Sequence, residues 1–358
     1  MVRLTRAQQQ ERTRAAVLTS ARAEFAARGY AEVKIDRIAE RAELTRGAVY
    51  SNFPSKRALY LAVLVDLVER EDTGPAPAFS PEPLGAFARV WLERLPLAGD
   101  SPTAGHLQLR SLAGVLDDEP ARAALGEVAR LEAMLLGLAL EAPGTRRVRL
   151  AELVLTLLTG AGHLADTAPG FGDPFDVTRA CEQLAGIDLA DGWDPPHLPL
   201  VAPAEACRAD WAPPADLVDQ VTGHPVRLDE DGVVAVLGAR RLSAAEEAVR
   251  AARPGDRVTV GVVTGDPAET GRLVRLRIAD LTRCLRRVFA PDALPRVRIV
   301  LDEDGLLAAA AGVADPGDDT ETAVRVHGGS VVARAAGRGA AHAAATATTE
   351  SSAGDRSG

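Results

Sequence analysis

The chain has 358 residues, which are too many for one compact core and suit two or three domains. Hydrophobic residues make up 47% and charged residues 25%, as in ordinary globular proteins, and the apolar run 133–140 is far shorter than the roughly 20 residues that span a bilayer. The net charge of −9 hides a basic N-terminal end, because the segment 1–70 carries 13 Lys and Arg against 8 Asp and Glu. We therefore expect no membrane span and an anionic partner for the N-terminal end.

The N-terminus and the cysteines indicate the compartment. Basic residues near the start are not followed by an apolar stretch, which argues against a secretory leader and predicts a cytoplasmic protein. The cysteines, Cys181, Cys207 and Cys284, stand far apart in the sequence and form no CxxC pair. This spacing argues against structural disulfides and cysteine-based zinc sites, so we expect neither a metal nor a cofactor.

The N-terminal segment 1–70 is predicted to form four helices. Apolar residues recur at intervals of three and four, Gly29 stands where a helix C-cap belongs, and Thr45 can cap the third helix. Two short helices joined by a tight turn inside a helical frame predict a helix-turn-helix unit. The four expected ranges are 8–29, 35–42, 46–52 and 55–70.

The next segment is also expected to be helical. Residues 71–83 are acidic and then rich in proline, which indicates a connection. Helical periodicity then returns in five pieces without strand-like alternation, so residues 71–190 should form an all-helical domain with its own core. The five pieces are 84–95, 103–116, 120–141, 147–166 and 174–184.

Composition changes again after residue 190. A proline-rich stretch predicts a linker over 191–210, and beyond it valine-rich runs alternate with helical patterns in the order β-α-β-α-β-β-β. This order predicts an α/β unit over 211–340, and residues 341–358, which are mostly Ala, Thr, Ser and Gly, should be a disordered tail. The expected strands are 233–237, 258–263, 297–301, 322–326 and 331–335, and the expected helices are 243–252 and 269–289.

One motif points to a family. Gly29-Tyr30 is followed by IAERAELTRGAVYSNFPSK at 38–56 and by Ala58-Leu59. This segment closely resembles the DNA-binding domain of the TetR family of transcriptional regulators, with its recurring pattern IAxxAGVSxGxxYxxFxxKxxL. The similarity covers roughly residues 12–68 and implies a helix-turn-helix DNA-binding domain over 1–70.

The chemistry of the segment agrees with that resemblance. Gly47 and Ala48 are small enough to let a helix backbone approach the floor of a major groove about 12 Å wide. Arg46 can reach a base edge or a phosphate, and Tyr50 and Lys56 can donate to phosphates. A solvated basic bundle without nucleic acid is the alternative for this segment. The expected DNA-binding residues are Lys34, Arg37, Thr45, Arg46, Gly47, Ala48, Tyr50, Asn52 and Lys56.

Three positions depart from the family pattern. Glu43 replaces the glycine usual in the turn, Lys34 replaces a threonine cap, and Asn52 stands where histidine or tyrosine is frequent. A left-handed Glu43 costs about 1 kcal/mol, and its carboxylate would lie near phosphates. We interpret the departures as a sign of an unusual operator or of weaker binding.

The resemblance also implies a homodimer and an effector. Family members pair through their last two helices, here 147–166 and 174–184, and a small molecule binds among the helices of residues 84–166. A plain core stripe is the alternative for the pairing face, and plain core or structural roles are the alternative for the pocket residues. The pairing face would hold Leu150, Leu153, Leu157, Leu158, Gly160 and Gly162. The pocket candidates are Trp91, His106, Arg110, Met134 and His163.

The C-terminal part has WAPP at 211–214 and TGHPVRL at 222–228, followed by the predicted strand 233–237 and by residues 297–305 and 324–337. In this order and spacing, residues 211–340 resemble thioredoxin-like proteins of the peroxiredoxin and thiol-disulfide oxidoreductase type. In those enzymes a nucleophilic cysteine follows the first core strand, but residues 238–243 of this chain contain no thiol. Cys284 is flanked by arginines but lacks a resolving partner in sequence. We therefore expect a catalytically degenerate scaffold without catalytic residues.

Together these features predict a multidomain protein, with an all-α TetR-like part followed by an α/β thioredoxin-like part. The expected function is that of a homodimeric repressor, not an enzyme, which binds a palindrome in double-stranded DNA and is released by an unknown small molecule. A thiol-dependent redox enzyme and a redox-sensing regulator are the alternatives.

Overall fold

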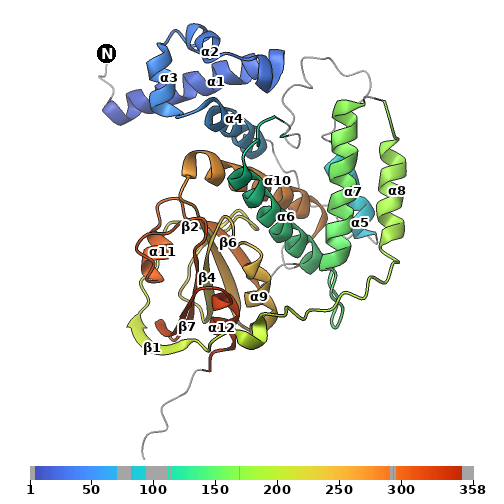
Figure 1. The fold of residues 1–358 in the computed structure, drawn as a ribbon, viewed down its shortest axis with the longest axis vertical. Helices are drawn as coiled ribbons and strands as arrows, with labels where there is room; N and C mark the ends of the chain where they lie inside the picture. Colours follow the sequence, from blue (N-terminus) through green and yellow to red (C-terminus); the bar gives the residue numbers. More distant parts are fainter. Residues whose placement is uncertain are drawn as a thin grey trace, which may run out of the picture. The chain divides into compact units, whose positions relative to one another are not determined.

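The fold is that of a computed structural model, which describes residues 5–70, 82–93, 112, 114–168, 170–290, 293 and 296–348. The chain forms two compact units, each made of three segments (Figure 1). Unit 1 comprises Met1–Leu125, Leu140–Leu189 and Asp266–Ala290. Unit 2 comprises Gly126–Ala139, Ala190–Gly265 and Pro291–Gly358.

Unit 1 is helical, as the sequence predicts. The predicted helical ranges are found here within a few residues, except that the expected helix 103–116 lies almost entirely outside the described residues. Helix α6 (Glu119–Leu140) begins in unit 1 and continues in unit 2. The other helices of unit 1 are α1 (Arg6–Glu32), α2 (Ile35–Arg41), α3 (Arg46–Asn52), α4 (Lys56–Arg70), α5 (Pro83–Leu92), α7 (Val148–Thr167), α8 (Pro174–Leu184) and α10 (Arg272–Val288).

Local signals set the ends of the N-terminal helices. Thr5 and Gln8 form a capping box at the start of α1, with reciprocal hydrogen bonds of 3.2 and 2.9 Å. Gly29 interrupts the helical backbone of α1 with a φ of 72°, a conformation that glycine adopts without a steric cost. The Thr45 hydroxyl accepts a hydrogen bond from the Ala48 N–H at 3.2 Å, so the predicted cap of α3 is confirmed.

The core beneath α1–α4, which we call the N-terminal head, is built from one hydrophobic cluster. Phe25, Phe53 and Leu59 are fully buried in it. Leu273 and Leu276 of α10 belong to the same cluster, although they stand far along the chain. The head is therefore completed by a helix from the C-terminal half of the sequence.

The place of α10 differs from the expectation. The helix expected at 269–289 falls within the predicted α/β unit over 211–340. Its main contacts are instead with α4 and α5 of unit 1. The periodicity of a helix gives its apolar face but not the surface on which that face packs.

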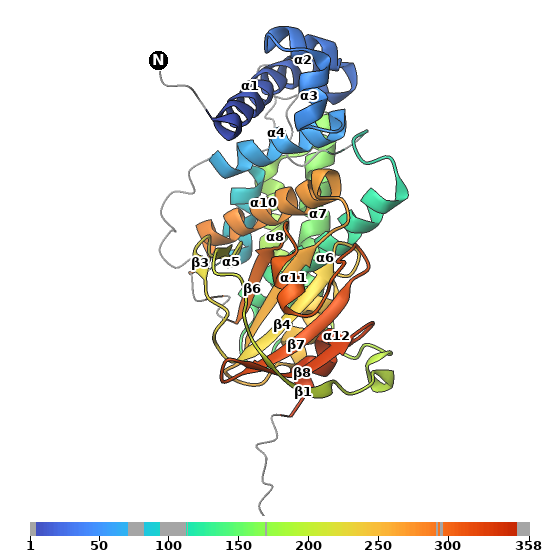
Figure 2. The same ribbon diagram turned by 90° about the vertical axis from the view of Figure 1, so that its left-hand side faces the viewer.

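Unit 2 contains a mixed six-stranded sheet in the order β1-β8-β7-β4-β5-β6 (Figure 2). Strands β4, β5 and β6 run parallel, and β7, β8 and β1 follow on the other side of β4 in antiparallel pairs. The five predicted strands are all present. The strands are β1 (Glu205–Asp210), β4 (Gly232–Gly238), β5 (Arg257–Val263), β6 (Val297–Leu301), β7 (Glu321–His327) and β8 (Ser330–Ala336), and β2 (Leu217–Val218) pairs with β3 (Pro225–Val226) in a separate hairpin.

Both faces of the sheet are covered. Helix α11 (Leu306–Ala310) and the β2–β3 hairpin share a core with Val234, Val236 and Val324. Because side chains alternate along a strand, the neighbours of these valines point to the other face. There α9 (Ala244–Ala251) and α12 (Ala340–Thr346) pack against each other and against β4.

Two expectations about this region are wrong. The end of the expected linker 191–210 is strand β1, which pairs with β8 and forms an edge of the sheet. The start of the expected disordered tail is helix α12, whose residues Ala343, Ala344 and Ala345 are buried. Alanine alone can form a tightly packed helix, so the absence of large apolar residues is misleading there.

Helix α7 has a further property. Its segment Val148–Ala165 is long and apolar enough to cross a membrane, and 39% of that segment is buried inside the protein. This is weak evidence for a membrane span, because core helices of soluble proteins pass the same test.

Candidate nucleic-acid interface

Helix α3 presents one side to solvent and one to the core. Val49 is fully buried, whereas Arg46, Gly47 and Tyr50 are exposed. The buried valine and Phe53, the residue that ends α3, fix the helix on the head. The exposed side therefore offers one cation, one phenol and a side-chain-free position where a backbone can come close to a partner.

Arg46 is exposed and only weakly engaged within the protein. Its side chain is 61% exposed, and its guanidinium lies 5.4 Å from the centroid of the Tyr50 ring. The carboxylate of Asp36 is 3.6 Å away, in an exposed pair of the kind that contributes little stability. Arg46 can thus exchange Asp36 for a phosphate or a base edge at small cost.

Other predicted contacts are engaged inside the protein. The Lys56 ammonium donates to the carbonyl of Ala31 at 3.1 Å and lies 4.5 Å from the Tyr30 ring centroid, and burial lowers the pKa of this lysine. The Asn52 amide donates to the Ala48 carbonyl at 2.9 Å. In this structure both side chains lie against the protein rather than pointing outward.

The remaining predicted positions lie around the turn between α2 and α3. Lys34 and Arg37 are exposed, while Ala48 is partly covered and Thr45 caps α3. Glu43 has a φ of 56°, so the expected left-handed backbone is confirmed. Lys34 precedes α2 without a side-chain cap, as expected from the lost threonine.

Sequence reasoning missed two cations that contact Phe53. The guanidinium of Arg14 lies 4.9 Å from the ring centroid and that of Arg272 lies 5.3 Å from it. Arg14 lies about one turn before Val17 and two turns before Ala21, on the apolar side of α1. Its position on the helix could therefore have indicated a contact with the core of the head. Nothing in the sequence connects Arg272 with Phe53.

Three of the five pocket candidates lie among the described residues. Trp91 is buried, with its ring 5.7 Å from that of Phe87, and Met134 is buried in the segment of α6 that belongs to unit 2. His163 is exposed on α7. His106 and Arg110 lie outside the described residues.

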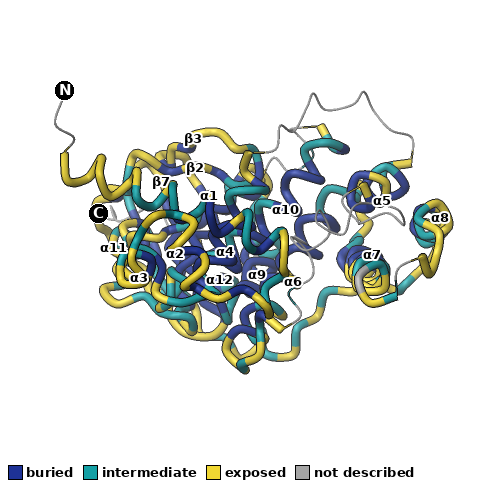
Figure 3. The backbone as a smooth tube through the Cα atoms, turned by 90° about the horizontal axis from the view of Figure 1, so that it is seen from above, coloured by how far each residue is buried: buried dark blue, intermediate teal, exposed yellow. Residues whose placement is uncertain are grey.

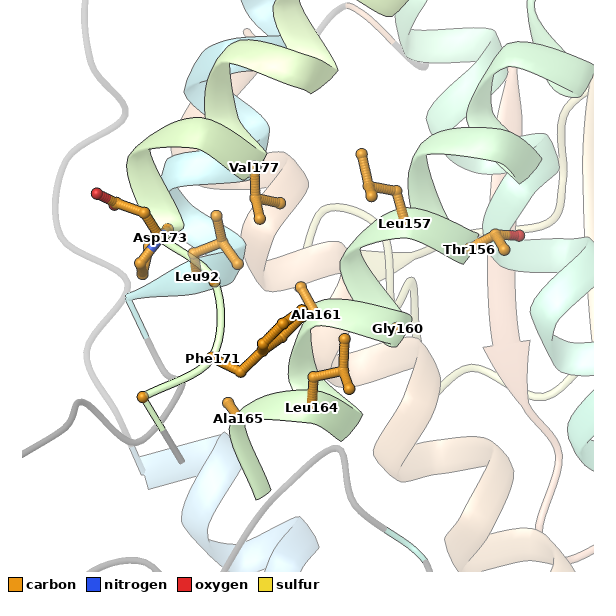
Figure 4. A pocket seen from close by; sticks show the side chains of 13 residues that line it. Leu92, Thr156, Leu157, Gly160, Ala161, Leu164, Ala165, Phe171, Asp173 and Val177 are labelled. Atoms are coloured by element: carbon orange, nitrogen blue, oxygen red, sulfur yellow. The ribbon is translucent and has the colours of Figure 1, made fainter. Parts of the chain in front are cut away.

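A cavity of about 620 Å³ lies instead between α7, α8 and the end of α5 (Figure 4). None of the described pocket candidates lines it. Its wall is mostly apolar, with Leu157, Leu164 and Phe171 prominent, and Thr156 and Asp173 supply polar atoms. Such a groove suits an apolar molecule or apolar side chains.

The predicted pairing face is divided between core and surface. Leu150 and Leu158 are buried, whereas Leu153 is 38% exposed and Gly160 is exposed. Figure 3 shows exposed residues on α7 and α8, and the side chain of Phe175 on α8 is 79% exposed. An apolar surface of this kind marks an interaction site more often than a solvated surface.

Ion pairs and a loop lie at the strand ends of unit 2, where an enzyme of this topology would hold its reactive groups. The Arg240 guanidinium pairs with Asp319 at 3.0 Å, and the Asp318 carboxylate accepts from the Thr264 hydroxyl at 2.6 Å. A side chain at Gly238 would collide with the Asp318 carbonyl. Among the described residues, no three His, Cys, Asp or Glu side chains are arranged to hold a metal ion.

None of the three cysteines forms a disulfide. Cys181 and Cys284 are buried and Cys207 is half-buried. Burial, with a contribution from the charge of Glu182, raises the pKa of the Cys181 thiol to about 11. Cys181 is therefore almost entirely a thiol at neutral pH, the form that reacts poorly with oxidants.

Known proteins resemble the N-terminal part of the chain. Residues 17–63 match the family described as bacterial regulatory proteins, tetR family. The HTH-type transcriptional regulator TtgR and the probable HTH-type transcriptional regulator ArpR, both of Pseudomonas putida, are each 38% identical over 96 residues, which is 26% of this chain and 45% of theirs. The matches thus span less than half the length of these relatives.

A solved structure also matches. The crystal structure of a TetR transcriptional regulator from Rhodococcus sp. RHA1 is 23% identical, and the match covers 49% of this chain and 97% of that chain with a TM-score of 0.32. The family match and the geometry of α2 and α3 agree on one conclusion. Residues 17–63 are a TetR-type helix-turn-helix domain.

Proposed function

We propose that the protein is a DNA-binding transcriptional regulator that acts as a repressor in the cytoplasm. One observation carries the proposal: the TetR-type domain holds α3 by its buried side and leaves Arg46, Gly47 and Tyr50 exposed together. Arg46 would contact a base edge or a phosphate, and Tyr50 a phosphate. Lys34 and Arg37, exposed beside the turn, would add phosphate contacts.

One such helix makes too few contacts for specific binding, so we further propose that the regulator is a homodimer on a palindrome. The apolar surface of α7 and α8, with Leu153, Leu164 and Phe175 exposed, would form the pairing face. A second copy of the same two helices would complete a four-helix bundle and remove these side chains from water. The two half-sites would lie about one helical turn of DNA apart, or a multiple of that distance.

A small apolar effector fits the same region. The cavity beside Phe171 and Leu164 has apolar walls and the size of a small-molecule site. Because its wall includes Leu157 and Gly160 of the proposed pairing face, a bound molecule would alter how two copies pair. That change would favour a separation of the two α3 helices that does not fit DNA.

For unit 2 we propose a thioredoxin-like scaffold without redox activity. The central strand order β5-β4-β7-β8, with two parallel strands and an antiparallel pair, supports the likeness. Residues 238–243, which follow the first core strand β4, contain no thiol, and this speaks against a redox enzyme in unit 2. Peroxide consumption by the purified protein that is lost on Cys284→Ser would support an enzyme instead.

The decisive experiment is selection of bound fragments from random double-stranded DNA with the full chain. We expect enrichment of a palindrome, and an affinity that falls steeply with salt because several phosphates are neutralised. Sedimentation of the complex should give two protein chains on each palindrome. A protein that enriches no sequence and binds no duplex at low salt would refute the proposal.

A further inference from the structure

Glu269, far from the helix-turn-helix in sequence, contacts the start of α4. It lies in a short turn (Pro267–Gly271, η2) before α10, where the Asp266 carboxylate accepts from its N–H at 3.2 Å and so fixes its backbone. The Glu269 carboxylate accepts hydrogen bonds from the Ser55 hydroxyl and from the guanidinium of Arg57. These are charge-assisted bonds, about twice as strong as neutral ones.

The contact is partly shielded from water. The side chain of Glu269 is 17% exposed and that of Arg57 25%, and a second carboxylate, Asp118, also accepts from Arg57. Ser55 additionally accepts from the Ala58 N–H at 2.9 Å and thereby caps α4. Glu269 thus holds the residue that begins α4 and the first arginine of that helix at the same time.

Arg272, one turn further on, contacts the end of the recognition helix. Its guanidinium lies 5.3 Å from the Phe53 ring centroid and donates to the Ala58 carbonyl at 3.0 Å. Phe53 is the fully buried residue that terminates α3. Glu269 and Arg272 therefore contact both sides of the joint between α3 and α4.

The rest of α10 supports this attachment. Leu273 and Leu276 lie in the hydrophobic cluster of the head, and Arg275 pairs with Glu69 near the end of α4 at 2.7 Å. In the chain, α10 follows β5 and precedes β6, both of which belong to unit 2. The joint is thus held by a segment that lies outside the two N-terminal helical regions of the sequence.

We propose that Glu269 and Arg272 are positioning residues for DNA recognition, because they set the angle at which α3 leaves α4. The inference rests on the proposed DNA binding. A recognition helix reads bases only where its side chains reach their edges, so a small rotation of α3 lowers affinity for the preferred sequence more than affinity for phosphates in general. These residues would tie sequence preference to the C-terminal half of the chain.

The test compares variants of the full chain on two duplexes, the palindrome enriched by the wild type and a random-sequence duplex of equal length. Glu269→Gln keeps the size of the side chain and removes its charge, and Glu269→Asp keeps the charge and shortens the side chain. The matched control is Glu93→Gln, which removes the carboxylate of another α10 ion pair, Arg287 with Glu93 at 2.6 Å, which does not involve the joint between α3 and α4. Thermal melting of each variant gives the folded fraction.

The measured quantity is the ratio of the affinity for the palindrome to the affinity for the random duplex. Unfolded protein lowers both affinities equally and leaves this ratio unchanged, as does the loss of a merely stabilising residue. We expect Glu269→Gln to reduce this ratio about tenfold, because a hydrogen bond to a charged group is lost at the joint. Glu93→Gln should leave it unaltered. Loss of a negative charge alone would instead strengthen binding to both duplexes, so the direction of the change separates the two causes.

Each other result contradicts either the inference about Glu269 or the proposed DNA-binding function. An enriched palindrome for the wild type with an unchanged ratio for Glu269→Gln overturns the inference and leaves the proposed function standing. An equal loss in Glu93→Gln also overturns it. If Glu269→Gln does not fold, the ratio for Glu269→Asp decides in the same way. If the wild type enriches no sequence, both the proposed function and the inference are wrong.

Discussion

Unit 2 and the N-terminal head of unit 1 use their charged side chains differently. On the N-terminal head of unit 1, Arg46 and Arg37 are exposed and have at most a weak partner within the protein. In unit 2, Arg325 is buried, and its guanidinium donates to both carboxylate oxygens of Asp256 at 2.8 and 3.0 Å. A charge that the fold leaves exposed is available to a partner, whereas a buried charge with an internal counter-charge serves the fold.

Further carboxylates of unit 2 have the same internal role. Asp302 accepts from the N–H groups of Leu307 and Ala308 at 3.0 and 2.7 Å and so caps α11. Glu321 is buried and accepts from the Gly339 N–H at 2.6 Å at the start of α12. These charges of unit 2 are thus used within the fold, whereas Arg46 and Arg37 remain available to a partner.

We expect the largest loss of stability from a substitution that breaks a buried ion pair of unit 2. Asp256→Ala leaves the guanidinium of Arg325 buried without its counter-charge, which typically costs about 3–5 kcal/mol. We expect that loss in the free energy of unfolding of unit 2, measured by urea denaturation. Asp319→Ala is the control, because its pair with Arg240 is mostly exposed and should matter little. Equal losses in the two variants would contradict the contrast between buried and exposed charges.

The next effect concerns recognition rather than folding. Arg46→Ala should reduce affinity for the selected palindrome by about 1–3 kcal/mol if Arg46 reads a guanine, with stability unchanged. Competition binding with a mutated palindrome measures the change. Arg70→Ala, which removes another exposed arginine at the far end of α4, is the control. An equal loss on all sequences would assign Arg46 to a phosphate.

The contrast between the units also explains what the sequence can predict. The bounds of α3 are predicted correctly at 46–52 because a cap residue and a buried valine lie within the helix or next to it. Strand β6 is predicted correctly at 297–301 because its valines, isoleucine and leucine are nearly contiguous. Signals of this kind depend only on neighbours in sequence.

What escapes prediction depends on contacts distant in sequence. Strand β1 lies at the end of a proline-rich stretch without an alternating pattern, and it is a strand because it pairs with β8. The attachment of Glu269 to Ser55 and of Arg272 to Phe53 joins segments that no local pattern connects. For the same reason the candidate DNA-contacting residues of α3 can be named from the sequence, but not the residues that orient α3.

A smaller change in stability is expected from a substitution in the strained turn between α2 and α3 of the head. Glu43 adopts a φ of 56°, which glycine adopts without a steric penalty. Glu43→Gly should therefore raise the free energy of unfolding of unit 1 by about 1 kcal/mol. Glu40→Gly, within the preceding helix, should lower it by a similar amount, since glycine is a poor helix former. A destabilised Glu43→Gly protein would show that the glutamate side chain has a stabilising role.

The smallest effect is a pH dependence in unit 2. Burial, together with the charge of His197, lowers the pKa of His342 on α12 below its usual 6.5. The folded state therefore favours the neutral imidazole, and its contribution to stability is complete above about pH 6.5 and is lost as the pH falls through the lower pKa of the folded state. His342→Gln cannot titrate. The free energy of unfolding of the wild type, measured relative to this variant, should consequently fall between pH 7 and pH 5.

A second shift nearby has the opposite sign. Burial, with the charge of Glu321, raises the pKa of Glu247, although the His197 imidazole 2.9 Å away opposes this. A raised pKa gives stability that is present at low pH and is lost as the pH rises through it. Because Glu247 is present in both proteins, its contribution largely cancels in the comparison of wild type with His342→Gln. A difference that stays constant from pH 7 to pH 5 would mean that the His342 imidazole is hydrated in the folded protein, and that α12 packs less tightly than the buried alanines around it indicate.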